Sequence, residues 1–470
     1  MMHIFKKILC VLSLLSIVFL VPSDAYANDG SIILETASLE HDASQGQYNS
    51  LVQVDSDTYA LAYEGANNHG HISTFTISSD GTSIVEVDTL EHDTVKGQYN
   101  SLVHVDSDTY ALAYAGNGDN GFISTFTIDS NGNITAVETQ SLGNNLEHDT
   151  VHGQYNSLVQ VNSTTIALAY AGFGENGFIS TFTIDSAAAI TAVETQSEGN
   201  NLEHDTHRGK ENSLVQVNST TIALAYEGKD RDGFISTFTI DSDTAAITAV
   251  KTQSLGNNLE HDTDRASFNS LVHVDSDTYA LAYTSHGEDG FISTFTIDSD
   301  TAAITAVKTQ SLGNNLEHDT DRASFNSLVH VDSDTYALAY TSHGEDGFIS
   351  TFTIDSDTAA ITAVKTQSLG NNLEYDEVRG IHNSLVQVDS DTYALAYTGT
   401  DANGFISTFT ISSDGTSIVE VKNLEHDTDV GNYPSLVQVD SDTYALAYTS
   451  GQKDGWISTF TISSDEIKEK

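Results

Sequence analysis

The sequence predicts an all-β protein in which eight small sheets of four antiparallel strands surround a common axis. Three observations predict this fold class. One phrase recurs eight times, each recurrence contains four short strand patterns, and apolar side chains lie on both faces of each predicted sheet. Together they predict one domain over residues 28–470, preceded by a targeting segment.

The targeting segment, residues 1–27, has the composition of a signal peptide. Lys6 and Lys7 are followed by an apolar run of 14 residues, 8–21, and then by the small-residue cleavage pattern Ala25-Tyr26-Ala27. The run is shorter than the roughly 18 residues that a membrane span needs. We therefore expect a secreted or cell-surface protein, with no membrane insertion after cleavage.

The composition limits the function classes. The chain carries 17 basic and 67 acidic residues, for a net charge of −50. This field repels nucleic acid and anionic lipid, and it attracts cations or basic partners. The only cysteine, Cys10, lies in the signal segment, so packing rather than disulfides must stabilise the exported domain.

The recurring phrase combines Leu-Glu-His-Asp, Asn-Ser-Leu-Val, Ala-Leu-Ala-Tyr and Ser-Thr-Phe-Thr-Ile. The leucines that open the eight units are Leu39, Leu90, Leu146, Leu202, Leu259, Leu316, Leu373 and Leu424. Their spacings of 51, 56, 56, 57, 57, 57 and 51 residues are typical of repeats that each form one sheet. Residues 240–317 recur identically at 297–374, which indicates recent duplication.

Each unit contains four predicted strands joined by turns, as the second unit illustrates. Its strand patterns cover residues 101–105, 109–114, 122–128 and 134–138. Asp106-Ser107-Asp108 and residues 129–133 are turn signals. Asn120-Gly121 predicts a tight hairpin, because both residue types tolerate positive φ.

The second strand pattern alternates large and small side chains. Tyr110, Leu112 and Tyr114 share one face, and Ala111 and Ala113 share the other. A sheet that is apolar on both faces needs a neighbour on each side, and a small-residue face packs densely against an aromatic one. A closed ring gives every sheet two neighbours, whereas an open stack leaves two apolar end faces uncovered.

The two ends of the domain complement each other. Residues 32–36 match the fourth-strand phrase of a unit, whereas the last unit ends after its third strand, residues 458–462. We therefore expect the N-terminal strand to complete the last sheet and close the ring. Frayed ends are the alternative.

Across residues 31–463 this pattern resembles β-propeller repeat proteins in general, without matching a particular family. WD-repeat propellers carry Gly-His and Trp-Asp signatures, whereas this chain has one tryptophan, Trp456. Integrin-type repeats carry a dense calcium loop, of which residues 116–121 are only a loose echo. The resemblance implies an eight-bladed propeller, in which each sheet is a blade, and it carries almost no functional content.

A Glu-His-Asp group opens each unit, in the loop predicted between the fourth strand of one sheet and the first strand of the next. Its members are Glu40, His41, Asp42, Glu91, His92, Asp93, Glu147, His148, Asp149, Glu203, His204, Asp205, Glu260, His261, Asp262, Glu317, His318, Asp319, Glu374, Tyr375, Asp376, Glu425, His426 and Asp427. Such groups can bind a sugar, a peptide or a metal ion. The alternative is a tether in which the buried histidine bonds to a neighbouring strand, and the tyrosine of one unit favours it because tyrosine is a poor zinc ligand.

A second repeated position lies just before the asparagine of each first strand. Its residues are Tyr48, Tyr99, Tyr155, Glu211, Phe268, Phe325, His382 and Tyr433. Aromatic rings beside carboxylates and amides such as that of Asn49 can bind carbohydrate through stacking and hydrogen bonds. The alternative is that the rings only pack the blade edge.

Three further sets of polar residues are candidate sites. Each first strand carries one polar residue at its middle, which either lines a central channel or bonds across blades. These residues are Gln53, His104, Gln160, Gln216, His273, His330, Gln387 and Gln438. The carboxylates of the Asp-Ser-Asp turns either bind calcium weakly or only form turns. They belong to Asp55, Asp57, Asp106, Asp108, Asp275, Asp277, Asp332, Asp334, Asp389, Asp391, Asp440 and Asp442. N-glycosylation sequons begin at Asn133, Asn162 and Asn218.

These features predict a non-catalytic exported or cell-surface propeller that binds protein or glycan partners through repeated loops, with no cofactor apart from weakly bound calcium. A multivalent lectin is the first alternative. A hydrolase or lyase with its site at the axial mouth is the second. Near-identical units argue against catalysis, because an active site needs one asymmetric set of groups with separated pKa values.

Overall fold

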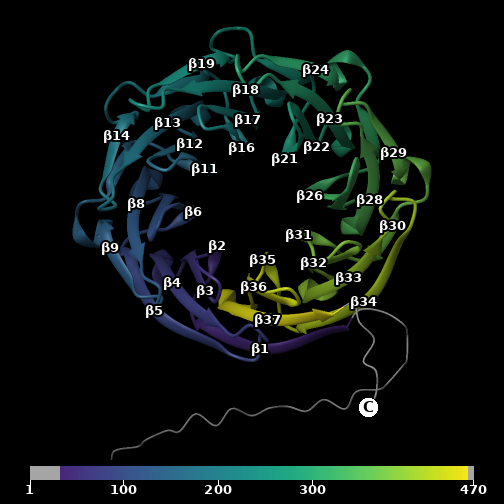
Figure 1. The fold of residues 1–470 in the computed structure, drawn as a ribbon, viewed down its shortest axis with the longest axis horizontal. Coiled ribbons are helices and arrows are strands. Elements are labelled where there is room, and N and C mark those ends of the chain that lie inside the picture. Colours follow the sequence, from purple (N-terminus) through teal and green to yellow (C-terminus); the bar gives the residue numbers. More distant parts are fainter. Residues whose placement is uncertain (1–31, 464–470) are drawn as a thin grey trace, which may run out of the picture.

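The computed structural model describes residues 32–463, which form eight antiparallel sheets arranged in a ring (Figure 1). The protein is therefore an eight-bladed β-propeller, as the repeat predicts. The predicted signal peptide, residues 1–27, lies outside the described residues. In the described part of the chain, no helix is long and apolar enough to cross a membrane.

Three strands of each blade follow one another outward from the axis, and the blades are numbered 1 to 8 in the order of their innermost strands along the chain. The innermost strands are β2 (Gln47–Gln53), β6 (Gln98–Asp106), β11 (Gln154–Asn162), β16 (Lys210–Asn218), β21 (Ser267–Asp275), β26 (Ser324–Asp332), β31 (Ile381–Gln387) and β35 (Asn432–Gln438). The second strands are β3 (Thr58–Glu64), β7 (Thr109–Ala115), β12 (Thr165–Ala171), β17 (Thr221–Glu227), β22 (Thr278–Thr284), β27 (Thr335–Thr341), β32 (Thr392–Thr398) and β36 (Thr443–Thr449). The third strands are β4 (Gly70–Ile77), β8 (Gly121–Ile128), β13 (Gly177–Ile184), β18 (Gly233–Ile240), β23 (Gly290–Ile297), β28 (Gly347–Ile354), β33 (Gly404–Ile411) and β37 (Gly455–Ser463).

The outermost strand is continuous in blades 1, 7 and 8 and split in two in the other blades. The continuous strands are β5 (Ile84–Asp93), β34 (Ile418–Asp427) and β1 (Ile32–Asp42). The split strands are β9 (Ile134–Glu138) with β10 (Leu146–Asp149), β14 (Ile190–Glu194) with β15 (Leu202–Asp205), β19 (Ile247–Lys251) with β20 (Leu259–Asp262), β24 (Ile304–Lys308) with β25 (Leu316–Asp319), and β29 (Ile361–Lys365) with β30 (Leu373–Asp376). The extra residues of the longer units, 140–145 in blade 2, interrupt the strand.

The core lies between the blades. The alanine face of blade 2, with Ala111 and Ala113, packs in one buried cluster against Leu168, Tyr170 and Phe182 of blade 3. All residues of β7 are buried. The predicted packing of a small-residue face against an aromatic face is therefore confirmed.

The ring closes between the two ends of the described chain. β1 pairs antiparallel with β37 and places Ile33 opposite Ile462, so blade 8 combines residues from both ends. The Thr36 hydroxyl also donates a hydrogen bond of 3.1 Å to the Thr459 carbonyl. The predicted closure by the N-terminal strand is confirmed.

β7 and β8 form the predicted hairpin, but the tight turn predicted at Asn120-Gly121 is wrong. A loop of residues 116–120 that contains the turn η2 (Asn117–Asp119) joins β7 to β8, and positive φ falls on Gly118 and Asp119. Asn120 is extended with φ −61°, and Gly121 is already in β8. Gly121 is instead needed for space, because a Cβ atom there would lie 2.3 Å from Cε1 of His148.

Candidate functional site

The Glu-His-Asp groups lie in strands, so their predicted loop position is wrong. In blade 2, Leu146 and Glu147 of β10 pair with Ile123 and Phe122 of β8. The groups therefore end the outermost strand of each blade. Their polarity suggested a loop, but His148 and Asp149 are buried and Glu147 is half-buried.

The glutamate and the aspartate of the group each have their own hydrogen-bond partners. The Asn120 amide donates 2.7 Å to Oε1 of Glu147, and Oδ1 of Asp149 accepts bonds of 2.9 and 3.1 Å from the backbone N–H groups of Val151 and His152. Within residues 32–463, no three or more His, Cys, Asp or Glu side chains gather at a metal site. The glutamate and the aspartate therefore make separate local contacts.

The histidines are interior packing residues. His148 is fully buried, with its ring edge-on to Tyr170 at 4.7 Å between centroids. Burial lowers the pKa of His148 to about 3, so its ring is neutral. The burial of the ring agrees with the tether interpretation. The expected bond to a neighbouring strand is absent, because the ring nitrogens have no hydrogen-bond partner in the described chain.

Tyr375 replaces this histidine in blade 6 and shows what its larger side chain reaches. Its hydroxyl donates 2.6 Å to Oδ1 of Asn383 in β31, the innermost strand of the next blade. The equivalent Oδ1 atoms that are buried without a partner in the described chain belong to Asn49, Asn100, Asn156, Asn212, Asn269 and Asn326. The histidine ring is too short to make the contact that the tyrosine makes.

The second repeated position has an unusual backbone conformation. Its residues, which we call the aromatic belt, are Tyr48, Tyr99, Tyr155, Glu211, Phe268, Phe325, His382 and Tyr433. All eight have φ between +52° and +57°, the left-handed region that favours glycine. In blade 2 the position is a β-bulge, because the register shifts between Gln98 and Ser101.

The rings of five successive pairs of belt residues contact one another. Ring centroids lie 5.1 Å apart for Tyr48–Tyr99 and 5.3 Å apart for Tyr99–Tyr155. On the other arc, the centroid separations for Phe268–Phe325, Phe325–His382 and His382–Tyr433 are 4.8, 4.5 and 4.3 Å. Because these residues begin the innermost strands, the belt surrounds one mouth of the axis.

A repeated asparagine ties six of the eight belt residues to the next blade. Asn100, for example, donates 3.2 Å to the Tyr48 carbonyl. The equivalent donors in blades 3 to 7 are Asn156, Asn212, Asn269, Asn326 and Asn383. Blade 8 departs from the pattern, because Pro434 replaces the asparagine and has no amide to donate. This position was missed in the sequence analysis, although the proline distinguishes it from the other units.

A pocket of about 310 Å³ opens at this departure. It is lined by the belt residue and the following residue of blades 6, 7, 8 and 1. Tyr433 is 50% exposed and Tyr48 is 37% exposed, and these two are the large belt side chains that face solvent most. A smaller hollow of about 50 Å³ lies between them, beside Gln47.

The mid-strand polar residues make three kinds of contact. Gln53 and Gln438 donate 3.1 Å to the hydroxyl groups of Tyr59 and Tyr444 in their own blades. Gln216 and Gln387 bond across blades, at 2.5 Å to the Val161 carbonyl and 3.3 Å to the Val331 carbonyl. The histidines bond within their own turn, as His104 does to the Ser107 carbonyl at 3.0 Å. All but Gln160 are exposed, which is compatible with a channel lining.

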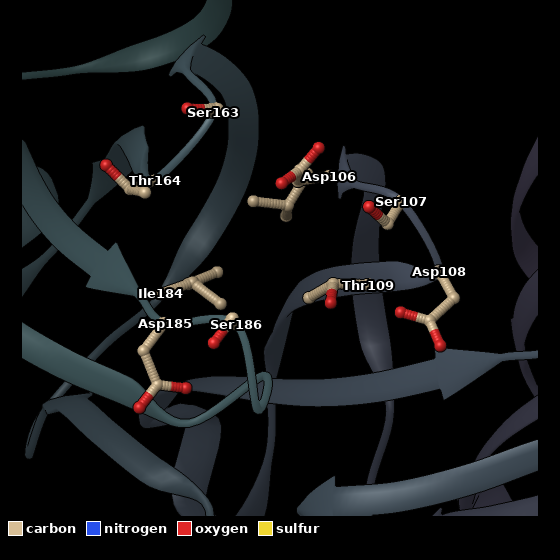
Figure 2. A pocket seen from close by; sticks show the side chains of 10 residues that line it. Asp106, Ser107, Asp108, Thr109, Ser163, Thr164, Ile184, Asp185 and Ser186 are labelled. Carbon is tan, nitrogen blue, oxygen red and sulfur yellow. The ribbon is translucent and has the colours of Figure 1, made fainter.

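The Asp-Ser-Asp turns lie at the opposite end of the innermost strands. Oδ1 of Asp55 accepts bonds of 3.1 and 3.0 Å from the backbone N–H groups of Asp57 and Thr58, which is an ordinary turn. A pocket of about 110 Å³ lies here between blades 2 and 3. Figure 2 shows the side chains of Asp106, Asp108 and Asp185 spread around it. Weak calcium binding remains a prediction.

The predicted sequons differ in access. Asn133 is exposed. The amide of Asn218 donates 2.7 Å to the Ser299 carbonyl of blade 5, and Oδ1 of Asn162 accepts from the backbone N–H of Thr164 at 3.0 Å. Glycosylation at any of them stays a prediction.

Comparison with known proteins shows similarity of fold. No family model and no curated protein matches the chain. Sqt1 of Saccharomyces cerevisiae has a TM-score of 0.56 at 11% identity, covering 92% of this chain and 99% of that one. The WD40 domain of SCAP from fission yeast gives 0.51 at 9%, covering 92% and 94%. The periplasmic gluconolactonase PpgL of Pseudomonas aeruginosa gives 0.51 at 11%, covering 78% and 96%.

Proposed function

We propose that this protein is a non-catalytic, exported binding scaffold for protein or glycan partners, and that its binding surface is the aromatic belt. The observation that carries the proposal is the backbone strain at all eight belt positions. A non-glycine residue in such a conformation costs on the order of 1–3 kcal/mol. Glycine would relieve the strain, yet no belt residue is glycine.

Selection for stability alone does not account for this choice. Contacts between aromatic pairs add about 0.5–1.5 kcal/mol each, which offsets only part of the strain. Tyr433 and Tyr48 gain least from packing, because they are the most exposed large side chains of the belt. Exposed aromatic rings held in strained positions on rigid strands favour recognition of a partner.

The test compares the two mouths of the propeller. The exported domain is immobilised and exposed to secreted and surface material from its own source, and the bound material is quantified. We expect Tyr48→Ala/Tyr433→Ala to lose most of the binding, whereas Asp108→Asn at the opposite mouth retains it. Equal binding by the belt variant would refute the proposal, provided that its thermal unfolding remains cooperative.

A further inference from the structure

The pocket beside blade 8 narrows the chemistry of the ligand. Resting on the proposed function, we infer that this pocket binds a neutral pyranose sugar, such as the terminal residue of a glycan. Its volume of about 310 Å³ lies at the lower end of the range for small-molecule sites. Four successive blades build it, so the rigid propeller positions all its walls.

The pocket is uncharged in a strongly acidic protein. Its lining consists of aromatic side chains, asparagine amides and Pro434, without any carboxylate, lysine or arginine. Burial, assisted by Arg379, lowers the pKa of His382 to about 4, so this side chain is neutral near pH 7. An anionic ligand is repelled by the net charge of −50, and a cationic ligand finds no carboxylate in the pocket to pair with. A neutral polar ligand satisfies both conditions.

The exposed rings suit a sugar face. Tyr433 and Tyr48 carry flat apolar rings with a hydroxyl at the tip, and Gln47 adds an amide to the hollow between them. A pyranose ring has the matching chemistry, because its C–H groups pack on an aromatic ring while its hydroxyls bond to amides and phenols. The Tyr433 ring packs against the His382 ring, with 4.3 Å between the ring centroids, and the side chain of Tyr433 is 50% exposed to solvent.

The site is single although the fold is repeated. The asparagine that ties one belt residue to the next blade is present in blades 2 to 7 and is replaced by Pro434 in blade 8. Asn49, which follows on the other side, donates 3.4 Å to the Gly46 carbonyl of its own blade. Within residues 32–463, its amide makes no bond to the belt residue of blade 8. The seams on both sides of blade 8 therefore differ from the others, and we expect one site per chain.

The experiment uses the exported domain and free neutral sugars. A panel of hexoses, N-acetylhexosamines, deoxyhexoses and pentoses is screened by saturation-transfer NMR, and hits are titrated by calorimetry. We expect saturable binding at one site, with saturation transferred mainly to ring C–H protons. Tyr433→Ala should weaken binding by tenfold or more. Tyr99→Ala should retain it, because Tyr99 has the same backbone conformation in the belt but lies outside the pocket.

The outcomes separate this inference from the proposed function. If no sugar of the panel binds saturably, or if Tyr99→Ala and Tyr433→Ala weaken binding equally, the inference is overturned. Belt-dependent capture of source material would then still support the scaffold proposal with another ligand class. If Tyr433→Ala does not unfold cooperatively, Gln47→Ala and Tyr433→Phe replace it, and unchanged affinity in both overturns the inference.

Discussion

At the residue scale, the side chain that precedes the third strand differs between blades and changes how stability depends on pH. In blade 3 the Asn176 amide donates 2.7 Å to Glu203, whereas blade 4 places Asp232 opposite Glu260. Burial and then the charge of Glu260 raise the pKa of Asp232 to about 7. A folded pKa above the unfolded value of 3.8 means that its contribution to stability is present below pH 3.8 and is lost as pH rises through 7.

We therefore expect Asp232→Asn to restore the amide–carboxylate bond and raise the melting temperature more at pH 8 than at pH 5. The reverse exchange, Asn176→Asp, should lower it more at pH 8. Both are measured by differential scanning fluorimetry across that range. An equal shift of the melting temperature at the two pH values would show that the carboxylate pair does not cause the loss of stability with rising pH.

The buried histidines have the opposite effect on stability, which they lower as the pH falls. His148, with its pKa lowered from 6.5 to about 3, contributes stability that is present above pH 6.5 and is lost as pH falls toward 3. The loss is up to about 1.4 kcal/mol per pH unit for one such group. His92, His204, His261 and His318 shift in the same direction, whereas the raised pKa of Asp149 opposes it.

We expect His148→Tyr to reduce this acid sensitivity. The new hydroxyl should reach Oδ1 of Asn156, as Tyr375 reaches Asn383, because the neighbouring glycines Gly121 and Gly153 match Gly347 and Gly380 of blade 6. Such a bond adds about 1 kcal/mol. The melting temperature should fall less between pH 7 and pH 5 than in the parent protein. A lower melting temperature at pH 7 would mean that the phenol does not fit.

At the element scale, residues 140–145 act as a clip between blades 1 and 2. Oε1 of Gln140 accepts 3.0 Å from the backbone N–H of Thr94, and the Ser141 hydroxyl donates to the Glu91 carbonyl. Deleting these six residues should restore a continuous strand like β5 and cost about 1–2 kcal/mol with a cooperative transition. Chemical denaturation measures the loss, and Gln140→Ala should account for part of it. Failure to fold would show that the clip is essential.

Strand periodicity predicted more of this structure than residue type did. β9 has the predicted bounds. β7 begins at the predicted Thr109 and ends one residue beyond the predicted end, because its large and small side chains alternate cleanly. β6 begins at Gln98, three residues before the predicted start, because the bulge at Tyr99 breaks the alternation there. Aromatic residues favour extended backbone, so their type concealed the positive φ of the belt. Asn120-Gly121 misled for the converse reason: its glycine accommodates a neighbouring ring, not a turn.

At the scale of the whole molecule, the ring depends on one terminal strand. The apolar faces of eight blades are all covered only if blade 8 is complete, and β1 supplies its outer strand. Ile33 is 5% exposed and packs in the cluster between blades 7 and 8, whereas its neighbour Leu34 is 57% exposed. Substitutions at Ile33 and Leu34 therefore compare a buried with an exposed side chain at adjacent positions of β1, which tests whether β1 closes the ring.

We expect Ile33→Asp to destabilise the whole propeller by at least about 3 kcal/mol, because it buries an unpaired charge where an apolar side chain packed. Leu34→Asp, one residue away on the solvent side, should change stability by less than about 0.5 kcal/mol. Freeing β1 exposes the edge of β37, so the Ile33 variant should also form dimers or larger species at high concentration. Urea denaturation and light scattering measure both effects. Equal, small losses in the two variants would mean that the ring holds together without β1, because contacts between blades alone suffice.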